Sequence, residues 1–543
     1  MIKFKTTFLL VFLGMCSMVF AAPGFGRLDR SGLMPRQGIH SIVVAASNSP
    51  QDVQTTADYL CDGTEDEVEI QAAINSLGSA GGVVKLAAGT YNTAARIDLD
   101  DNVEIVGSGW NTIIDAANFD DRVIRAEQKS QVAVKNLKVD FTSREIDTAS
   151  PQALYFNESD NISVEWVWVI GYGDGSYAKG SGDCITFRKS DDILVDNCRV
   201  QGGWHNLMLN SGCKDAVINN IVSKYAGVEH VLTEWAYDST HDGTRGERIT
   251  INNVVGDGAG QHGIYVADHN NVTISNCTIR NTRGDGLKLL YTDNVTVNNF
   301  INHNTASNDS LRIEDTATKV SISNSQFLDP DSTGTYGAHI SGSEILLTGC
   351  AISGSESNPG IRLEGATDVS FIGCDIIDMP YNIGIQVMSD ANHVTFDGCH
   401  INDVGAWYVF DVDGDNVIVS NCQITDNGVA NTINLDAGTG HIIKGNIIDA
   451  DGCEIFDVES GVTELIISDN IFKNTDTFTI DAQQVNVSGN VWQSTKDTPS
   501  YLINFQGNSE NAIVIGNVAP SSLYGTGFIT STGTDIDDVN NVN

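Results

Sequence analysis

A short alternation of apolar and polar residues, closed by Asn or Gly, recurs along most of this chain. Examples are VTISNC from Val272, VTVNNF from Val295 and VIVSNC from Val417. Alternation of this kind is typical of a half-buried β-strand. Asn and Gly enter left-handed backbone conformations at low cost, so they suit a sharp bend after each strand. The expected bends lie at Asn136, Trp166, Asn197, Asn220, Asn253, Asn276, Asn299, Asn324, Gly349, Gly373, Gly398, Asn421, Gly445, Asp469, Gly489 and Asn517.

Most of these bends are about 23 to 25 residues apart, a period that indicates a solenoid. Each repeat holds roughly three short strands, and each strand pairs with its equivalent in the next coil, about 4.8 Å away. A single coil cannot bury its own apolar side, so the stack supplies the core. The pattern predicts an all-β parallel β-helix over residues 93–520, with about 16 coils and a length on the order of 75 Å.

The chain begins with a segment typical of a secretory signal peptide, at residues 1–21. Lys3 and Lys5 precede an apolar run, and Ala21 closes a plausible cleavage site. Residues 22–40 lack periodicity and are expected to form a leader. No later apolar run in the sequence is long enough to span a membrane. We therefore expect a secreted protein, located outside the cell or in the periplasm.

Residues 41–92 are expected to close the first coil of the stack, because an open end would expose strand edges and core. They combine a short strand with an amphipathic helix. Thr64 is the expected cap of this helix, with Glu67 as its partner three residues on. The polar tail at residues 521–543 is expected to be frayed.

The segment CDGTEDEVEIQAAINSLGSAGGVVKLAAGTYNT, from Cys61, resembles the N-terminal segment of pectate-lyase-like proteins. The VTISNC repeats resemble the asparagine-ladder turns of the same superfamily. The resemblance spans roughly residues 40 to 520 and implies a right-handed parallel β-helix with an N-terminal capping helix. Members include polysaccharide lyases, glycoside hydrolases, epimerases, phage tailspikes and proteins without known chemistry, so the fold alone does not give the function.

Charge limits the partners of this protein. The 543 residues include 30 Lys and Arg against 70 Asp and Glu, a net charge of −40. Nucleic acid is itself a polyanion, so it is not an expected partner. The same excess of acid also suits solubility or a salty medium.

The cysteines indicate packing rather than cross-linking. An exported chain with 11 cysteines would ordinarily suggest disulfides. Here six of them directly follow a bend, and Asn446, Asn470 and Asn490 take the same place in later coils. We therefore expect small buried side chains with free thiols at Cys198, Cys277, Cys350, Cys374, Cys399 and Cys422. The sequence assigns no pairing to Cys61, Cys184, Cys213 and Cys453.

A row of basic and aromatic residues is expected to point outward from one strand of successive coils. Its members are Tyr265, Lys288, Arg312, His339 and Arg362, and Arg188 is expected on the same face upstream. Positive charge gathered on an acidic protein suggests an acidic ligand, and an extended uronate polysaccharide suits a long groove. The alternative is a solvated face on which Lys288 pairs with Glu314.

Lys288 and Arg312, on adjacent coils, suit a β-elimination. A base removes the proton α to the uronate carboxylate, and a cation stabilises the enolate that develops. The pair is similar to the Lys and Arg of β-helix alginate and chondroitin lyases, which implies that Lys288 is the base and that Arg312 neutralises the carboxylate. The Asp-rich metal motif of pectate lyases is absent. Calcium stays a possible cofactor, with Asp268, Asp285 and Glu314 nearby in register.

A long insertion between Asn220 and Asn253 is a second place for binding residues, since loops on a rigid scaffold often carry them. It holds Glu229, His230, Glu234, Trp235, His241, Asp242 and Arg245, while Trp204 and His205 lie one coil earlier. Trp204 and Trp235 are expected to stack on sugars. The favoured function is lyase action on an acidic extracellular polysaccharide. The alternatives are a non-catalytic carbohydrate-binding or structural surface protein, or a hydrolase using loop carboxylates such as Glu234.

Overall fold

A computed structural model gives the structure of this chain. It describes residues 40–116, 121–142, 152–171, 182–234, 245–330, 336–354, 357–379, 381–404, 407–425, 431–450, 453–495, 501–523, 525–539 and 541. The signal peptide and nearly all of the leader expected from the sequence lie outside these residues. So do Trp235, His241 and Asp242. Within the described part, no helix has the length and apolar character needed to cross a membrane.

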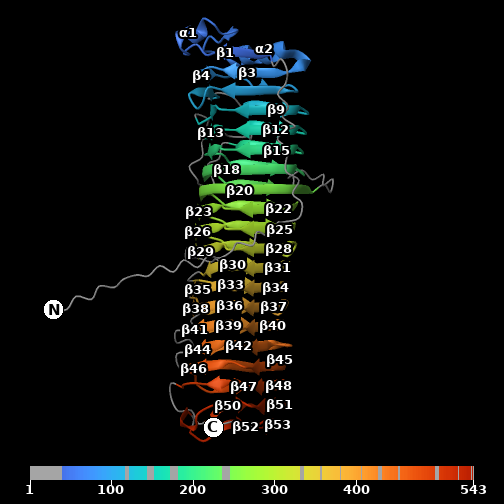
Figure 1. Cartoon of the computed structure of the whole chain (residues 1–543), viewed down its shortest axis with the longest axis vertical. Helices are drawn as coiled ribbons and strands as arrows, with labels where there is room; N and C mark the ends of the chain where they lie inside the picture. The colour runs from blue at the N-terminus through green and yellow to red at the C-terminus, as the bar shows by residue number, and fades with distance from the viewer. Residues whose placement is uncertain are drawn as a thin grey trace, which may run out of the picture. The chain divides into compact units, whose positions relative to one another are not determined.

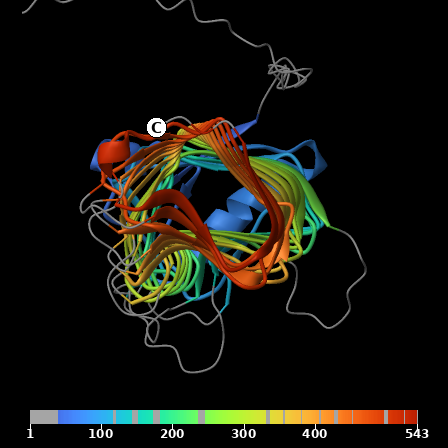
Figure 2. The same ribbon diagram turned by 90° about the horizontal axis from the view of Figure 1, so that it is seen from below.

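The described part from residue 40 is a stack of coils, and all strand pairs within it are parallel (Figure 1). Three strands per coil build three faces, seen end-on in Figure 2. Face A consists of β5 (Ile97–Asp98), β8 (Ile124–Glu127), β11 (Gln152–Asn157), β14 (Asp183–Arg188), β17 (Leu207–Asn210), β19 (Val231–Glu234), β21 (Ile264–Ala267), β24 (Leu287–Leu290), β27 (Leu311–Ile313), β30 (Ala338–Ile340), β33 (Ile361–Leu363), β36 (Ile383–Val387), β39 (Tyr408–Val412), β42 (Asn431–Thr439), β45 (Glu454–Ser468), β47 (Phe478–Ile480), β50 (Tyr501–Phe505) and β52 (Gly527–Ser531).

Face B follows face A along each coil, and β45 runs from one into the other. It consists of β1 (Ser41–Ala45), β3 (Gly82–Leu86), β6 (Val103–Gly107), β9 (Ser130–Lys135), β12 (Asp160–Glu165), β15 (Asp191–Asp196), β18 (Lys214–Ala226), β20 (Gly246–Ala259), β22 (His269–Ser275), β25 (Asp293–Asn298), β28 (Thr318–Ser323), β31 (Ser343–Thr348), β34 (Thr367–Ile372), β37 (Asn392–Asp397), β40 (Asp415–Ser420), β43 (Ile442–Lys444), β48 (Gln483–Ser488), β51 (Glu510–Ile515) and β53 (Thr534–Val539).

Face C closes each coil, and the long strands β18 and β20 turn the corner into it. It consists of β4 (Gly89–Asn92), β7 (Thr112–Asp115), β10 (Lys138–Asp140), β13 (Trp168–Ile170), β16 (Arg199–Gln201), β23 (Thr278–Thr282), β26 (Ile301–Thr305), β29 (Gln326–Pro330), β32 (Ala351–Ser353), β35 (Asp375–Met379), β38 (His400–Val404), β41 (Gln423–Thr425), β44 (Ile447–Asp449), β46 (Ile471–Lys473) and β49 (Val491–Trp492). The two-residue β2 (Tyr59–Leu60) pairs with β1.

Helix α2 (Glu67–Leu77) closes the N-terminal end, and Figure 2 shows it crossing the far end of the stack. It buries Ile70, Ala73, Ile74 and Leu77. The predicted cap was wrong, because Asp66, not Thr64, precedes the first helical turn. Thr64 instead donates its hydroxyl to Asp62, at 2.7 Å. The short α1 (Gln51–Gln54), a 3-10 turn at Gly78–Ala80 and another at Ser521–Leu523 are the other helical pieces described.

The C-terminal end carries more structure than a frayed tail. Strands β52 and β53 pair with β50 and β51, so coil stacking continues past residue 520. Alternating apolar residues explain this, since Phe528 and Ala519 are buried in the core.

The bends between faces B and C are left-handed, as expected, with φ near +50° to +70° from Asn136 to Gly489. The sequence predicted Asn517 as the last bend and an inward-facing ladder of Asn276, Asn299 and Asn324, and both predictions were wrong. The last bend is Gly516, not Asn517. The bend side chains also point outward: Asn276, Asn299 and Asn324 are exposed, and Asn299 donates to Asn276 at 3.0 Å. The residue at the apex of the corner faces solvent, and the next residue enters the core.

That next position forms an inward-pointing column; small residues occupy it where predicted, and other coils carry Leu137, Val167, Ile221, Val254 and Phe300 there. Its Cys198, Cys277, Cys350, Cys374, Cys399 and Cys422 are free and buried. Later coils carry a buried asparagine ladder in the same column. Asn446 donates its amide to the Asn470 side chain, and Asn470 donates to Asn490, both at 3.0 Å. Cys61, Cys184 and Cys213, for which the sequence assigned no pairing, are also free and buried.

Candidate functional site on face A

The backbone register places the five residues of the expected stripe on one line. Tyr265 pairs with Lys288, Lys288 with Arg312, Arg312 with His339, and His339 with Arg362. We call this line the central column. It follows from coil stacking, because each residue is the strand partner of the next.

Arg188 belongs to a different line. Its strand partner is Asn210, which in turn pairs with Glu234. This line lies two residues further along each strand, and Glu314 and Glu364 occupy the same relative place beside Arg312 and Arg362. We call it the flanking column. Arg188 is thus on face A as expected, but not in the central column.

The central column is less open than the sequence suggested. His339 is buried, with 8% of its surface exposed, and Lys288, Arg312 and Arg362 are half-buried. His339 lies between two carboxylates, with Nδ1 3.6 Å from Asp309 and Nε2 3.5 Å from Glu364. Its ring also packs edge-on against Tyr336.

Carboxylates balance the positive charge of the central column. Arg312 contacts Glu314 at 2.7 Å and Asp309 at 3.1 Å, and Arg362 contacts Glu364 at 3.1 Å. Burial raises the pKa of Glu314, but the hydrogen bond and charge of Arg312 outweigh it, so the pKa is lowered overall. Pairing of the cations with neighbouring acids, the alternative raised by the sequence, is therefore present.

Among the lysine and arginine side chains of this column, Lys288 lies furthest from its nearest carboxylate. Its Nζ lies 3.4 Å from Glu314 Oε1 and 5.2 Å from the centroid of the Tyr265 ring. Burial, together with the charges of Glu234 and Glu229, raises the pKa of Tyr265, so its phenol is neutral near neutral pH. An ammonium group and a phenol therefore lie side by side on adjacent coils.

A third line, the leading column, lies three residues before the central column. It begins with Asp183, His205 and Glu229. His205 Nδ1 is 2.7 Å from Asp183 and its Nε2 is 3.2 Å from Glu229. Burial lowers the pKa of His205, but the two carboxylates more than reverse this and raise it to about 10. The imidazole is thus a cation held between two buried acids.

The leading column continues with His262, Asp285 and Asp309. The Asp285 backbone N–H donates to His262 Nδ1 at 2.9 Å, and Asp285 Oδ1 accepts from the Asp309 N–H at 2.9 Å. Burial raises the pKa of Asp285, but His262 and Lys288 oppose it, so the pKa is lowered overall. The sequence did not reveal this column as a unit, because loops of different length precede its members.

Glu234 ends β19 inside the long insertion, and the described part of the chain resumes at residue 245. Burial raises its pKa, and the charges of Glu229 and Asp268 add to this effect, while His205 opposes it. Trp204 is partly exposed at the corner between faces C and A, where its backbone N–H donates to the Gly182 carbonyl at 2.6 Å. The structure therefore places Trp204 beside the leading column, and Trp235 lies outside the described residues.

Comparison with known families settles the class of the fold. Residues 239–311 and 310–519 match the family described as right handed beta helix region. The chain belongs to this right-handed β-helix family. A search of curated protein sequences found no significant match.

The solved structures that match this β-helix protein include the following three. The catalytic unit of an α-1,3-glucanase from Streptomyces thermodiastaticus strain HF3-3 is 14% identical, with 89% of this chain and 68% of that chain covered and a TM-score of 0.33. An alginate lyase from Paenibacillus sp. FPU-7 is 16% identical, covering 46% and 92%, with a TM-score of 0.35. An exopolygalacturonase from Thermotoga maritima is 14% identical, covering 65% and 87%, with a TM-score of 0.36. These values do not extend to a shared substrate or reaction.

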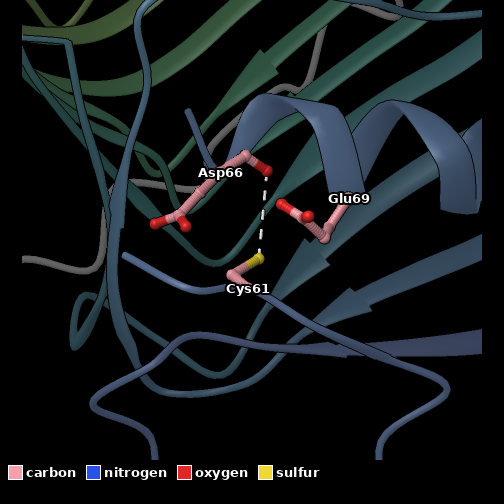
Figure 3. Close-up of side chains that lie close together, drawn as sticks. All are labelled: Cys61, Asp66 and Glu69. Carbon is pink, nitrogen blue, oxygen red and sulfur yellow. Dashed lines mark hydrogen bonds between the residues drawn. The ribbon is translucent and has the colours of Figure 1, made fainter. Parts of the chain in front are cut away.

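One group of three metal-ligating side chains occurs among the described residues of this β-helix protein, and it is not on face A. Cys61, Asp66 and Glu69 meet at the start of α2 (Figure 3). Both Asp66 oxygens already accept backbone N–H groups, from Gly63 and Asn92 at 2.8 Å each. Burial also raises the pKa of the Cys61 thiol, which keeps it protonated. The group therefore fits a cap of the first coil better than a metal centre.

Proposed function

We propose that this β-helix protein cleaves a uronate-containing polysaccharide by β-elimination on face A. The observation that carries the proposal is the position of Lys288. Its closest carboxylate is more distant than that of either arginine of the central column, and it has the Tyr265 phenol on one side and Arg312 on the other.

In this proposal Lys288, in its neutral form, removes the proton on the carbon α to the uronate carboxylate. The electron pair of that bond forms a carbon–carbon double bond, and the bond to the glycosidic oxygen breaks. Tyr265 supplies a proton to the leaving oxygen. Arg312 faces the carboxylate and stabilises the negative charge that develops there.

In this scheme Arg312 exchanges a carboxylate of the protein for that of the substrate. Glu314 and Asp309 hold it in the absence of substrate. A substrate carboxylate competes with them for the same guanidinium, whose fork of donors serves two acceptors at once. Arg362 and His339 lie further along the central column and would bind neighbouring sugars, and Arg188, Trp204 and Trp235 are proposed to do so upstream. Calcium is not needed for any step of the scheme.

A second candidate, glycoside hydrolysis, is favoured by Glu234, a half-buried carboxyl group at the end of β19. Burial raises its pKa, which suits a general acid. In this alternative Glu234 protonates the leaving oxygen.

A panel of acidic polysaccharides, assayed for ultraviolet-absorbing unsaturated ends and for reducing ends, tests both candidates. Elimination gives both signals, and hydrolysis gives reducing ends alone. Lys288→Ala should lower turnover by about 10²- to 10⁴-fold, while Arg362→Ala should raise KM with a smaller effect on kcat. Lys319→Ala, on face B and paired with Asp293, is the matched control.

Reducing ends without unsaturation, lost in Glu234→Gln, would replace the lyase by the hydrolase. Unchanged turnover in Lys288→Ala would remove Lys288 as the base. A chain that neither binds nor cleaves any glycan of the panel would leave the non-catalytic rod as the function.

A further inference from the structure

Trp166 occupies a position where a large residue is out of place. It forms the bend between β12 and β13, with φ of +56°. The equivalent bends from Asn136 to Gly489 otherwise carry Asn, Gly or Asp. This left-handed conformation costs most L-amino acids roughly 1–2 kcal/mol, and Gly, Asn and Asp are the residues that adopt it routinely. The Trp166 side chain is also 51% exposed, so burial does not explain it.

Two further tryptophans, both partly exposed, lie near Trp166. The Trp110 indole N–H donates to the Trp166 carbonyl at 2.9 Å. The rings of Trp110 and Trp168 pack edge-to-face, with centroids 5.5 Å apart. Three of the seven tryptophans of the chain are thus gathered at one place, and the hydrogen bond and ring contact fix the orientation of Trp110.

Cations complete this cluster. The Arg199 guanidinium lies 4.6 Å from the centroid of the Trp110 ring, and Lys138 Nζ lies 5.2 Å from that of Trp168. Lys138 also pairs with Asp140 at 2.8 Å. Arg199 is exposed, and within the described part of the chain its guanidinium makes no ion pair. On a protein with 70 acidic residues, an exposed arginine that stacks on an indole instead of a carboxylate is available to an anion.

The cluster is separate from the proposed catalytic face. Trp168 and Arg199 are strand partners on β13 and β16 of face C. The central column runs along face A, on other strands of the coil and in coils nearer the C-terminus. No residue is shared between them, and the Trp166 cluster is a second site rather than an extension of the first.

We propose that Trp110, Trp166, Trp168 and Arg199 form a second, non-catalytic binding site for an acidic saccharide. The apolar face of a pyranose ring packs on an exposed indole, and its carboxylate binds Arg199. A rigid aromatic platform beside one uncompensated cation fits an amphipathic, anionic ring. A protein partner or a second copy of the chain would instead need a larger apolar surface than one cluster flanked by charged residues. The ligand class is taken from the proposed function, but the site stands on its own contacts.

The test uses the full chain carrying Lys288→Ala, so that no probe is consumed, and titrates it calorimetrically with oligogalacturonate and, separately, with a neutral glucan oligosaccharide. We expect two bound oligogalacturonates per chain. Trp166→Asn should remove one of them or weaken it about tenfold. It should not lower the melting temperature, because Asn suits the bend and the Trp166 N–H to Asp196 carbonyl bond is kept. Arg199→Ala should weaken the acidic probe and leave any neutral binding unchanged.

Tyr225→Asn is the matched control, since Tyr225 is also an exposed aromatic residue with φ of +50°. It should leave both bound probes in place. The inference is overturned if Trp166→Asn and Arg199→Ala leave number and affinity unchanged, or if Tyr225→Asn has the same effect. It is also overturned if Trp166→Asn converts a dimer to a monomer in sedimentation, since the cluster would then be a contact between copies. If both sites exist, the parent binds two probes and Trp166→Asn binds one. If face A does not bind, the parent binds a single probe and Trp166→Asn abolishes that binding.

Discussion

Single side chains in this protein take their chemistry from the coil above and the coil below. His205 is an example, since Asp183 comes from the preceding coil and Glu229 from the following one. The sequence does not show that these two acids contact His205. The spacing from Asp183 to His205 is 22 residues, and that from His205 to Glu229 is 24, because the connecting loops differ in length.

This arrangement predicts a stability that falls in mildly alkaline solution. The pKa of His205 is raised to about 10 in the folded chain, above its ordinary value near 6.5. Its contribution is therefore fully present below about pH 6.5 and is lost as the pH rises through about 10. Denaturant unfolding between pH 6 and pH 10 should show a loss on the order of 4 kcal/mol.

His205→Gln is the informative variant for that slope. Glutamine keeps hydrogen-bonding groups between the two acids but has no proton to lose in this range. The variant should be less stable than the parent at pH 6, and the difference should shrink toward pH 10. Parallel pH profiles for parent and variant would show that the imidazolium does not contribute.

From Cys350 to Asn517, the position after each B-to-C bend carries a small side chain that donates a hydrogen bond to the previous coil. Cys422 does so with a thiol that donates to the Phe396 carbonyl at 3.5 Å, and Asn446 does so with an amide that donates to Val419 at 2.8 Å. The sequence predicted this column from the shared size of Cys, Ser and Asn. It did not predict that the bend residue itself faces outward, because alternation says nothing about the direction of a residue at a corner.

Cys422→Asn should therefore extend the asparagine ladder by one step. The Cys422 backbone N–H already donates to Asn446 Oδ1 at 2.8 Å, as Asn446 does to Asn470. We expect the free energy of unfolding to change by less than about 1 kcal/mol, since the new amide finds both partners in place.

Cys422→Leu is the contrast, and it should cost about 1–3 kcal/mol because Cys422 is 2% exposed, so a larger side chain overpacks this coil, and leucine cannot donate to the Phe396 carbonyl. Thermal unfolding of the two variants under the same reducing conditions separates the explanations. An equal loss of stability in the two variants would show that size and hydrogen bonding do not determine which residue this position accepts.

For the whole molecule, the sequence predicted the features that repeat from coil to coil and did not predict the features in which the coils differ. Alternation and bend spacing predicted the solenoid, the three-strand coil and the line from Tyr265 to Arg362. They did not predict the charges around that line. Glu314, Asp309 and Glu364 are visible in the sequence, but only the stacked strands show that they neutralise Arg312 and Arg362.

The N-terminal end gives a prediction at this scale. Helix α2 covers the first coil with Ile74, which is 1% exposed, while Val68 on the same helix is 57% exposed. Ile74→Glu should lower the free energy of unfolding by about 3 kcal/mol or more, because it buries an unpaired charge. Val68→Glu should have little effect and is the control. Light scattering should then show association of the Ile74→Glu protein only, through the uncovered strand edges; equal behaviour of the two variants would show that α2 is not the cover.

All strand pairs of the described stack are parallel, so the backbone hydrogen bonds run along its long axis. A force that pulls the two ends apart along that axis loads a full layer of these bonds on all three faces at once. A force that draws one terminus sideways breaks them a few at a time as a coil peels away. Since each coil contacts only its neighbours, peeling proceeds coil by coil. The rod is therefore stiff toward tension transmitted through its length and weak toward unwinding from an end, and the cover that α2 gives the first coil opposes unwinding from that end.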